Sequence, residues 1–448
     1  MESIAAKLAM LQDQVARVLA LAKKRGASAA EAGAHLDEGL SVSARLGEAE
    51  SIEYHRDQKL AITVYMGQRK GSASTSDLSP TSLEETVEAA CAIARFANED
   101  RYAGLPDPEK LAWEPPDLDL YHPWEIDPDQ ALERAIECEA EALQFDPQIV
   151  NSEGATLTSH HGIRVLGNTH GFLHGYPASR HSLSCVVVGR RGEEMQRDHW
   201  YTVARDSKEL ESPACCGRKA AERTIARLGA RPLNTRTCPV IYAAEVATSL
   251  IGHFLAAIRG GNLYRQASFL LDSLERQVFP EFVHIHEEPH LRKGLGSAPY
   301  DSEGVATYPH DLVQNGKVKS YILGTYSARK LGLVTTGNAG GVHNVLVDPG
   351  PLDFQDLIRE MGTGLVVTEL IGHGVNLVTG DYSRGAVGFW VENGEIQHPV
   401  EEITIAANLK KMFHELLAIG RDVDRRGNIQ TGSIWLSNMT VAGSPLKH

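Results

Sequence analysis

The sequence predicts an α+β fold: two related units, each a helix, an antiparallel sheet and a second helix, followed by a large β-rich C-terminal domain. Three observations lead to this prediction. Helices with a 3.6-residue apolar period bracket alternating, strand-like stretches in residues 1–105, and the same order recurs in residues 127–232. From residue 233 to 448 the chain changes to glycine, turns and short apolar stretches.

The first unit, residues 1–105, begins with apolar side chains spaced three or four residues apart from Ile4 to Lys24, which predicts a helix. Ser82 followed by Glu85 matches a capping box, so the closing helix is expected to run from there to about Ala97. Alternating stretches between the two helices predict strands at 40–46, 51–55, 60–65 and 72–76.

Residues 106–126 are rich in proline and acidic side chains, which predicts a linker. The second unit, residues 127–232, then repeats the order of the first. Glycine-flanked basic turns at 67–71 and 189–192 occupy the same place in both units, and this indicates an internal duplication. The elements expected in the second unit are a helix at 127–144, strands near 149, 162–166 and 181–188, and a helix at 211–228.

Residues 233–448 contain no second proline-rich linker, so they are expected to form one large, mainly β domain. The elements predicted from periodicity are a short strand at 240–242 and helices at 245–259, 353–361 and 406–419.

Composition is that of a globular protein, and charge and apolar patterning argue against nucleic-acid binding and a membrane span. The chain has 448 residues, of which 42% are hydrophobic and 23% charged, as in ordinary globular proteins. Its 58 acidic against 44 basic side chains give a net charge of -14, which disfavours binding to nucleic acid. The six cysteines show no CxxC spacing, and no apolar run reaches about 18 residues. We therefore expect a cytoplasmic protein with reduced thiols and no membrane span.

His286, Glu287 and His290 form a literal H-E-x-x-H, the pattern of zinc metalloproteases. That chemistry needs both histidines on one face of a helix, with the glutamate beside the metal-bound water. Pro289 lies inside the motif, and the preceding residues 282–286 alternate as a strand does. The pattern favours the end of a strand, and a zinc site at these residues is kept as the alternative.

Six blocks, spread in order over nearly the whole chain, match the pattern of a known family. The blocks are 62–74, 77–80, Asp301-Ser302-Glu303-Gly304-Val305, 326–333, Gly380-Asp381-Tyr382-Ser383-Arg384-Gly385 and 389–396. On these blocks the chain resembles the TldD/PmbA metalloprotease family, and within it the PmbA (TldE) branch.

The resemblance implies a subunit that pairs with a TldD-like catalytic sister chain to degrade small or unfolded peptides. The sister presents H-E-x-x-x-H on a helix and a cysteine near the C-terminus. The corresponding positions here are Thr248, Ser249, His253 and Thr431. One imidazole and two hydroxyls do not supply the donors that zinc needs, and Ser249 offers no carboxylate as a base.

These substitutions imply that this chain has no catalytic residues, metal or cofactor of its own, and that zinc belongs to the sister. Arg329, Tyr382 and Arg384 lie in the family blocks and are candidates for contact with substrate or partner. A homodimer of the isolated chain stays an open alternative. The competing functions are an independent zinc peptidase built on His286, Glu287 and His290, and a non-enzymatic modulator of DNA gyrase.

Overall fold

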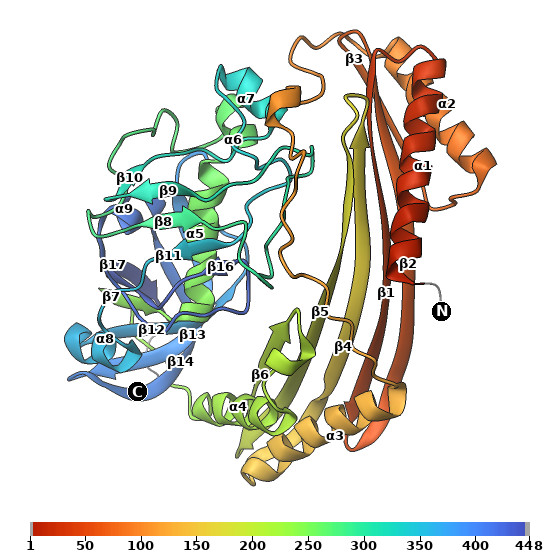
Figure 1. Cartoon of the computed structure of the whole chain (residues 1–448). Coiled ribbons are helices and arrows are strands. Elements are labelled where there is room, and N and C mark those ends of the chain that lie inside the picture. The colour runs from red at the N-terminus through yellow and green to blue at the C-terminus, as the bar shows by residue number, and fades with distance from the viewer. Residues whose placement is uncertain (1–2, 444–448) are drawn as a thin grey trace.

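The computed structural model describes residues 3–443, so residues 1–2 and 444–448 of the two predicted terminal domains lie outside the described part. A long antiparallel sheet with four helices forms the N-terminal half, and a β-rich domain lies beside it (Figure 1). The predicted α+β class is confirmed.

The first unit follows the predicted order, but its strands are much longer than expected. Its elements are α1 (Ile4–Lys24), β1 (Ala29–Arg45), β2 (Glu48–Met66), β3 (Arg69–Thr75) and α2 (Pro80–Phe96). The predicted cap of α2 at Ser82 is wrong. Ser79 is the N-cap, its side chain accepts from the Ser82 amide, and Pro80 begins the helix.

The second unit repeats this order, again with longer strands than predicted. Its elements are α3 (Pro128–Phe145), β4 (Ile149–Asn168), β5 (Leu173–Arg191), β6 (Glu194–Ala204), a short 3₁₀ turn η2 (Ser207–Glu209) and α4 (Pro213–Ala226). Asp127 and Gln130 form a capping box at the start of α3.

The two units share one six-stranded sheet with the order β3-β2-β1-β4-β5-β6. The central pair, β1 and β4, is antiparallel, so the second unit continues the sheet of the first in mirrored order. All four helices cover one face of the sheet. Side chains of β1 at 30, 32, 34 and 36 pack with α1 and α2, and those at 40, 42 and 44 pack with α3 and α4.

Glu139 of α3 holds the far end of the β1–β2 hairpin. Its side chain is 1% exposed, and its two carboxylate oxygens accept from the amides of Leu46 and Gly47, both at 2.9 Å. Both turn residues have positive φ, at 51° for Leu46 and 79° for Gly47. A buried carboxylate needs hydrogen-bond donors, and the amides of the turn supply them. The turn and the Glu139 side chain therefore stabilise each other.

The predicted linker is an ordered strap between the sheet and the C-terminal domain. It contains a short 3₁₀ turn, η1 (Pro108–Lys110), and its Leu111 and Ala112 are buried. These two side chains form a small core with Phe172 of the β4–β5 turn and Tyr300 of the C-terminal domain. The strap therefore contributes apolar surface to the junction between the two halves.

The C-terminal domain contains two sheets. One has the order β10-β9-β8-β11-β16, and the other has the order β14-β13-β12-β7-β17-β15. In the second sheet β14 also pairs with β17, so β14, β13, β12, β7 and β17 form a closed ring of strands. The strands are β7 (Arg236–Tyr242), β8 (Ile285–Glu287), β9 (His310–Gln314), β10 (Lys317–Val318), β11 (Val345–Val347), β12 (Gly364–Ile371), β13 (Asp381–Glu392), β14 (Glu395–Asn408), β15 (Leu416–Ile419), β16 (Ile429–Gln430) and β17 (Ile434–Ala442).

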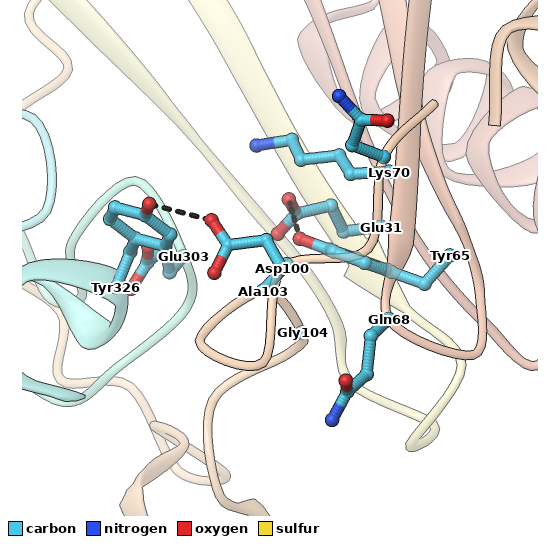
Figure 2. Close-up of a pocket in the computed structure, with 10 residues that line it drawn as sticks. Glu31, Tyr65, Gln68, Lys70, Asp100, Ala103, Gly104, Glu303 and Tyr326 are labelled. Carbon is cyan, nitrogen blue, oxygen red and sulfur yellow. Dashed lines mark hydrogen bonds between the residues drawn. The ribbon is translucent and has the colours of Figure 1, made fainter. Parts of the chain in front are cut away.

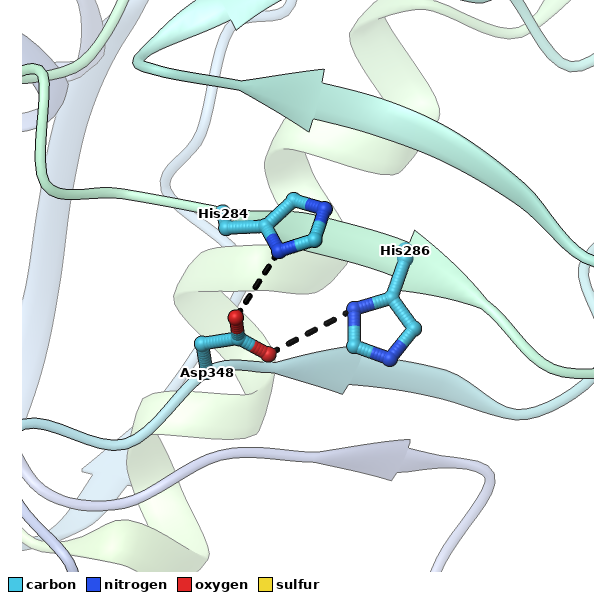
Figure 3. Close-up of side chains that lie close together, drawn as sticks. All are labelled: His284, His286 and Asp348. Carbon is cyan, nitrogen blue, oxygen red and sulfur yellow. Dashed lines mark hydrogen bonds and ion pairs between the residues drawn. The ribbon is translucent and has the colours of Figure 1, made fainter.

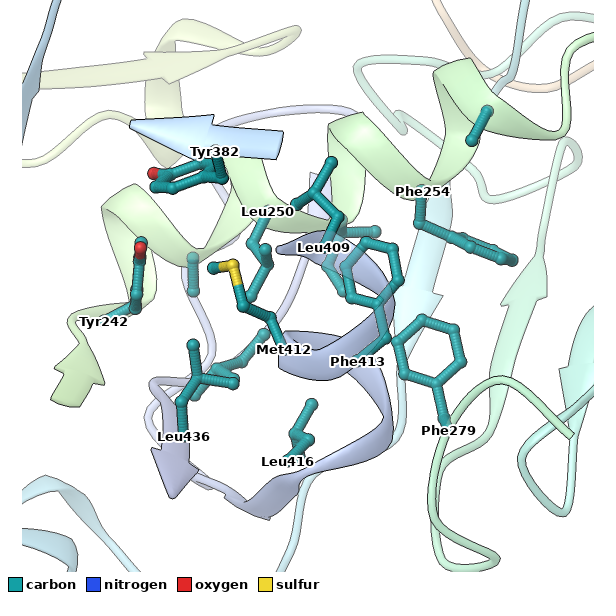
Figure 4. Close-up of a cluster of buried hydrophobic side chains, with 14 of the residues drawn as sticks. Tyr242, Leu250, Phe254, Phe279, Tyr382, Leu409, Met412, Phe413, Leu416 and Leu436 are labelled. Atoms are coloured by element: carbon teal, nitrogen blue, oxygen red, sulfur yellow. The ribbon is translucent and has the colours of Figure 1, made fainter. Parts of the chain in front are cut away.

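The helices of this domain are α5 (Ala244–Ala257), α6 (Gly260–Tyr264), α7 (Thr325–Leu331), α8 (Phe354–Met361) and α9 (Leu409–His414). The helix predicted at 406–419 is wrong at both ends. Residues up to Asn408 continue β14, and Leu416 pairs with Leu436 of β17, so only the middle is helical. Figure 4 shows the main core, which includes Leu250 and in which Phe254 of α5 packs against Phe413 of α9 and Phe279.

Five of the six cysteines are buried and Cys215 is half-buried, and all six are free thiols. None of the helices in residues 3–443 is long and apolar enough to cross a membrane.

Candidate functional site

Helix α5 carries three of the four positions that the family resemblance singled out in the sequence, namely Thr248, Ser249 and His253. Apolar residues cover one side of the helix and are buried in the main core, whereas Thr248, Ser249 and His253 are half-buried. The Thr248 hydroxyl donates to the Glu245 carbonyl at 2.9 Å, and the Ser249 hydroxyl donates to the Val246 carbonyl at 2.7 Å. Both hydroxyls are therefore engaged with their own helix.

His253 lies beside two residues of β13 that the sequence singled out. Its ring meets Tyr382 edge to face at 5.9 Å between ring centres. Burial, with a smaller effect of the nearby Arg384 guanidinium, lowers the pKa of His253. Three buried polar atoms here have no hydrogen-bond partner: His253 Nε2, Tyr382 Oη and Arg384 Nε. The structure thus brings Tyr382, Arg384 and His253 together, and Figure 4 shows Tyr382 above α5.

Thr431, the fourth position, follows β16 and is fully buried. Its hydroxyl donates to the Gly432 carbonyl at 3.0 Å. Strand β16 lies against α5, since a Cβ added at Gly252 would meet Ile429 at 3.9 Å. The segment of Thr431 therefore packs against the helix that carries His253, although 178 residues separate the two positions in the sequence.

These residues do not fit a zinc ion. The hydroxyls of Thr248, Ser249 and Thr431 already donate to backbone carbonyls, which leaves the His253 imidazole as the one nitrogen donor of the four positions. Zinc sites use three or four cysteine, histidine or carboxylate ligands. The positive charge of Arg384 beside His253 further disfavours a cation here.

A cavity of about 640 Å³ opens at the first residues of α5, between the second unit and the C-terminal domain. Apolar side chains from Trp200, Phe354, Phe389 and Ile396 form part of its wall. Glu245, the first acidic residue of α5, accepts from Arg223 of α4 at 2.6 Å at the edge of this cavity. The lining of this cavity comes from segments that lie far apart along the chain, so no local sequence pattern predicts it.

Arg426 and Asp424 add further charge to the same wall. Arg426 Nη2 donates to Asp424 at 2.8 Å and lies 3.5 Å from Glu245. Burial would raise the pKa of Asp424, but hydrogen bonds and charge from Arg426 outweigh it, and the pKa lies below its usual range. The cavity therefore combines an apolar wall with fixed charges of both signs.

The H-E-x-x-H segment forms the short strand β8 and its end, as the sequence predicted. Because side chains alternate along a strand, His286 and Glu287 face opposite sides of the sheet. Glu287 is 1% exposed and accepts from Asn338 and His343. His290 contacts the Thr307 hydroxyl at 3.0 Å. Each side chain of the motif thus has its own surroundings, and the helical geometry of a zinc peptidase is absent from these residues.

Arg329 of α7 holds the start of the strap. Its guanidinium donates to the carbonyls of Leu105 at 2.8 Å and Gly104 at 3.3 Å, and lies 3.4 Å from the Asp107 carboxylate. These contacts tie α7 to the residues at the start of the strap.

A second cavity, of about 310 Å³, lies between the first unit and the C-terminal domain. Figure 2 shows Glu31, Tyr65, Lys70, Asp100 and Tyr326 around it. The Tyr65 hydroxyl donates to Glu31 at 3.1 Å, and the Tyr326 hydroxyl donates to Asp100 at 2.7 Å. Burial, and next the charge of Glu303, raises the pKa of Glu31 to about 7.

Comparisons with known proteins match nearly the whole chain. Residues 30–94, 121–228 and 235–443 match domain 1, the central domain and the C-terminal domain of the PmbA/TldA metallopeptidases. The chain is 50% identical over 440 residues to the metalloprotease PmbA of Escherichia coli O157:H7, which covers 98% of both chains. It is 50% identical over 435 residues to a PmbA homologue of Haemophilus influenzae, covering 97% of this chain and 96% of that one.

Two solved structures share the fold. One, from Bacteroides thetaiotaomicron, is described as a candidate modulator of DNA gyrase; it has a TM-score of 0.92 and 26% identity, and the match covers 99% of this chain and 100% of that one. The other, TldE from Thermococcus kodakarensis, has a TM-score of 0.85 and 22% identity, with 96% and 100% covered. On the sequence matches, this chain belongs to the PmbA/TldD metalloprotease family.

Proposed function

We propose that this chain is the non-catalytic, PmbA/TldE-like subunit of a cytoplasmic two-chain zinc metalloprotease that degrades small or unfolded peptides. A TldD-like sister chain supplies the zinc and the catalytic base. The observation that supports this most is that the side chains of α5 at the motif positions do not offer a set of zinc ligands. The hydroxyls of Thr248 and Ser249 donate back to their own helix, and a guanidinium lies near the single imidazole that remains.

The role of this chain in the pair is to shape and close the substrate chamber. The 640 Å³ cavity beside α5 supports this role, because its aromatic and aliphatic wall offers contact to apolar side chains of an unfolded peptide. The charges of Glu245, Asp424 and Arg426 on the same wall can pair with polar groups of such a peptide.

The test is to reconstitute the pair from this chain and a TldD-like sister and to follow cleavage of an unfolded peptide. The pair should cleave the peptide, and this chain alone should be inactive. His253→Ala in this chain should leave kcat of the pair within about twofold, because no proton or metal passes through it. As the matched comparison, replacing the first histidine of the sister's H-E-x-x-x-H should abolish activity.

Three outcomes contradict the proposal. Peptide cleavage by this chain alone, lost on His253→Ala or on His286→Ala, would make it an independent peptidase. Full activity of the sister without this chain would remove its role in the chamber. Direct association with DNA gyrase, with no effect on peptide cleavage, would favour the modulator alternative, against which the net charge of -14 argues where DNA contact is needed.

A further inference from the structure

Two histidines and an aspartate converge on one face of the β8–β11 pair, away from α5. His284 directly precedes β8, and His286 lies two residues on, so their side chains share a face of the sheet. Leu346 of β11 pairs with His286, and Val347 pairs with Ile285. Asp348, the next residue, therefore lies beside His284, and its amide donates to the His284 carbonyl at 3.1 Å.

The three side chains point towards one another (Figure 3). Asp348 Oδ2 lies 2.8 Å from His284 Nδ1, and Asp348 Oδ1 lies 3.5 Å from His286 Nδ1. One ligand atom of each residue lies within 4.8 Å of the other two. Within residues 3–443, these three residues form the one group of histidine, cysteine or acidic side chains whose ligand atoms lie close enough to share a metal ion.

His286 Nδ1 adds a second observation that points to a ligand. This nitrogen is buried and has no hydrogen-bond partner, although it is directed at the Asp348 carboxylate. A buried imidazole nitrogen without a partner is costly, and a metal ion is one group that satisfies it.

Asp311 of β9 supports the group from the other side. Its Oδ1 lies 2.7 Å from His284 Nε2, and its Oδ2 accepts from Gln314 at 3.0 Å. A histidine that binds a metal through one ring nitrogen commonly donates its other N–H to a carboxylate. A proton held on Nε2 by Asp311 would leave the Nδ1 lone pair of His284 for a metal ion in the space that it shares with Asp348.

We propose that His284, His286 and Asp348 bind one divalent transition-metal ion of the zinc class, with Asp311 as a positioning residue. Two imidazoles and one carboxylate are a donor set that such ions accept, and three protein ligands leave a fourth position for water or another group. The Asp348 side chain is 50% exposed, so an ion can enter from solvent. This inference does not rest on the proposed function, and it departs from the sequence expectation that the chain holds no metal.

The test uses the full chain without an affinity tag, stripped by a chelator, and titrated with Zn²⁺ by calorimetry and with Co²⁺ by visible absorption. We expect about one ion per chain. His286→Gln and Asp348→Asn should each weaken binding by about a hundredfold, and Asp311→Asn by about tenfold. The matched controls are His373→Gln and Asp272→Asn, both exposed and outside the group, which should bind as the parent does.

Circular dichroism of each variant establishes folding, and Asp348→Asn decides the matter if His286→Gln does not fold, since its side chain is half exposed. A titration without saturable binding would overturn the proposal. The short contacts of His284 would then be explained by a protonated imidazole between two aspartates. Equal binding by the parent and Asp348→Asn would also overturn it. Binding that is lost on His253→Gln but kept in His286→Gln would place the ion at α5 and would contradict the proposed function as well.

Discussion

The guanidinium carbon of Arg426 lies 3.8 Å from the centre of the Trp200 ring. Trp200 belongs to β6 of the N-terminal sheet, and Arg426 belongs to the C-terminal domain, so this contact joins the two halves of the molecule. The Trp200 indole N–H also donates to Glu211 at 3.1 Å, which fixes the ring. A cation stacked on an aromatic ring at this distance gains attraction from the ring in addition to buried area.

Trp200→Ala should loosen the docking of the C-terminal domain. The loss of the stacked cation and of the apolar wall of the cavity should lower the free energy of unfolding by about 2–4 kcal/mol. Calorimetry should show a lower temperature for the first unfolding transition. If the coupling between the two halves is lost, they should unfold in separate transitions. Tyr54→Ala, which removes an aromatic ring 72% exposed on β2, is the control and should leave the transitions in place. An unchanged scan for Trp200→Ala would contradict the role of this contact.

Arg329→Met should free the start of the strap. The arginine donates to two carbonyls, of Gly104 and Leu105, and the methionine keeps its apolar length but no donor. Cleavage by a protease of low specificity within residues 98–127 should become about tenfold faster, which corresponds to about 1.4 kcal/mol in the local opening equilibrium.

The control for the strap is Arg265→Met, which removes a contact to Asn262 within the same local helix. It should be cleaved at the parent rate. Equal protection of Arg329→Met and the parent would show that the buried residues of the strap, such as Leu111 and Ala112, hold it without the arginine.

Local patterns predicted the helices well and the strands only in part. The apolar period from Ile4 to Lys24 marks α1 from end to end, because one face of it is buried. The start of β1 was missed because its buried positions are Ala30, Ala32 and Ala34, whose small side chains give a weak alternating pattern. The helix at 406–419 failed because pairing of Leu416 with β17 overrides the helical spacing there.

The candidate sites depended on two kinds of signal. The family's metal motif, carried over to this sequence, pointed to α5 with His253, and a family block pointed to β13 with Tyr382; the structure brings these two residues together. The group on β8 and β11 has no such local signal, because 64 residues separate His284 from Asp348 and strand pairing alone makes them neighbours. The H-E-x-x-H match is the reverse case. The sequence carries the motif of a zinc-binding helix, but the residues form a strand, so the motif does not indicate the site of a zinc peptidase.

Leu46→Asn should stabilise the first unit. Leu46 has φ of 51°, a left-handed conformation that costs a branched residue about 1 kcal/mol and that asparagine adopts readily. Its side chain is 58% exposed, so little apolar burial is lost. Chemical denaturation should show a gain of about 1 kcal/mol. Ile52→Asn on β2, where an exposed apolar side chain is also replaced, is the control and should show no gain. A loss of stability in Leu46→Asn would mean that the leucine makes contacts that outweigh its strain.

The chain should lose stability as the pH rises from about 5 to 8, and Glu31 should account for part of this loss. Burial and the charge of Glu303 raise the pKa of Glu31 from 4.5 to about 7. The folded chain therefore holds this proton more tightly than the unfolded chain does. Its contribution to stability is complete below about pH 4.5 and is lost as the pH rises through about 7. Asp301, whose pKa burial also raises to about 7, acts in the same direction.

Glu31→Gln separates these two contributions, because a glutamine keeps an oxygen that accepts from Tyr65 but carries no charge. At pH 8 the variant should be more stable than the parent by about 2 kcal/mol, and at pH 5 the two should be nearly equal. Denaturant unfolding at a series of pH values measures both differences. Glu48→Gln, an exposed carboxylate at the start of β2, should follow the parent at every pH. If the stability of Glu31→Gln also follows that of the parent at every pH, Glu31 is ionised in the folded chain at pH 5. The second cavity then does not hold its proton.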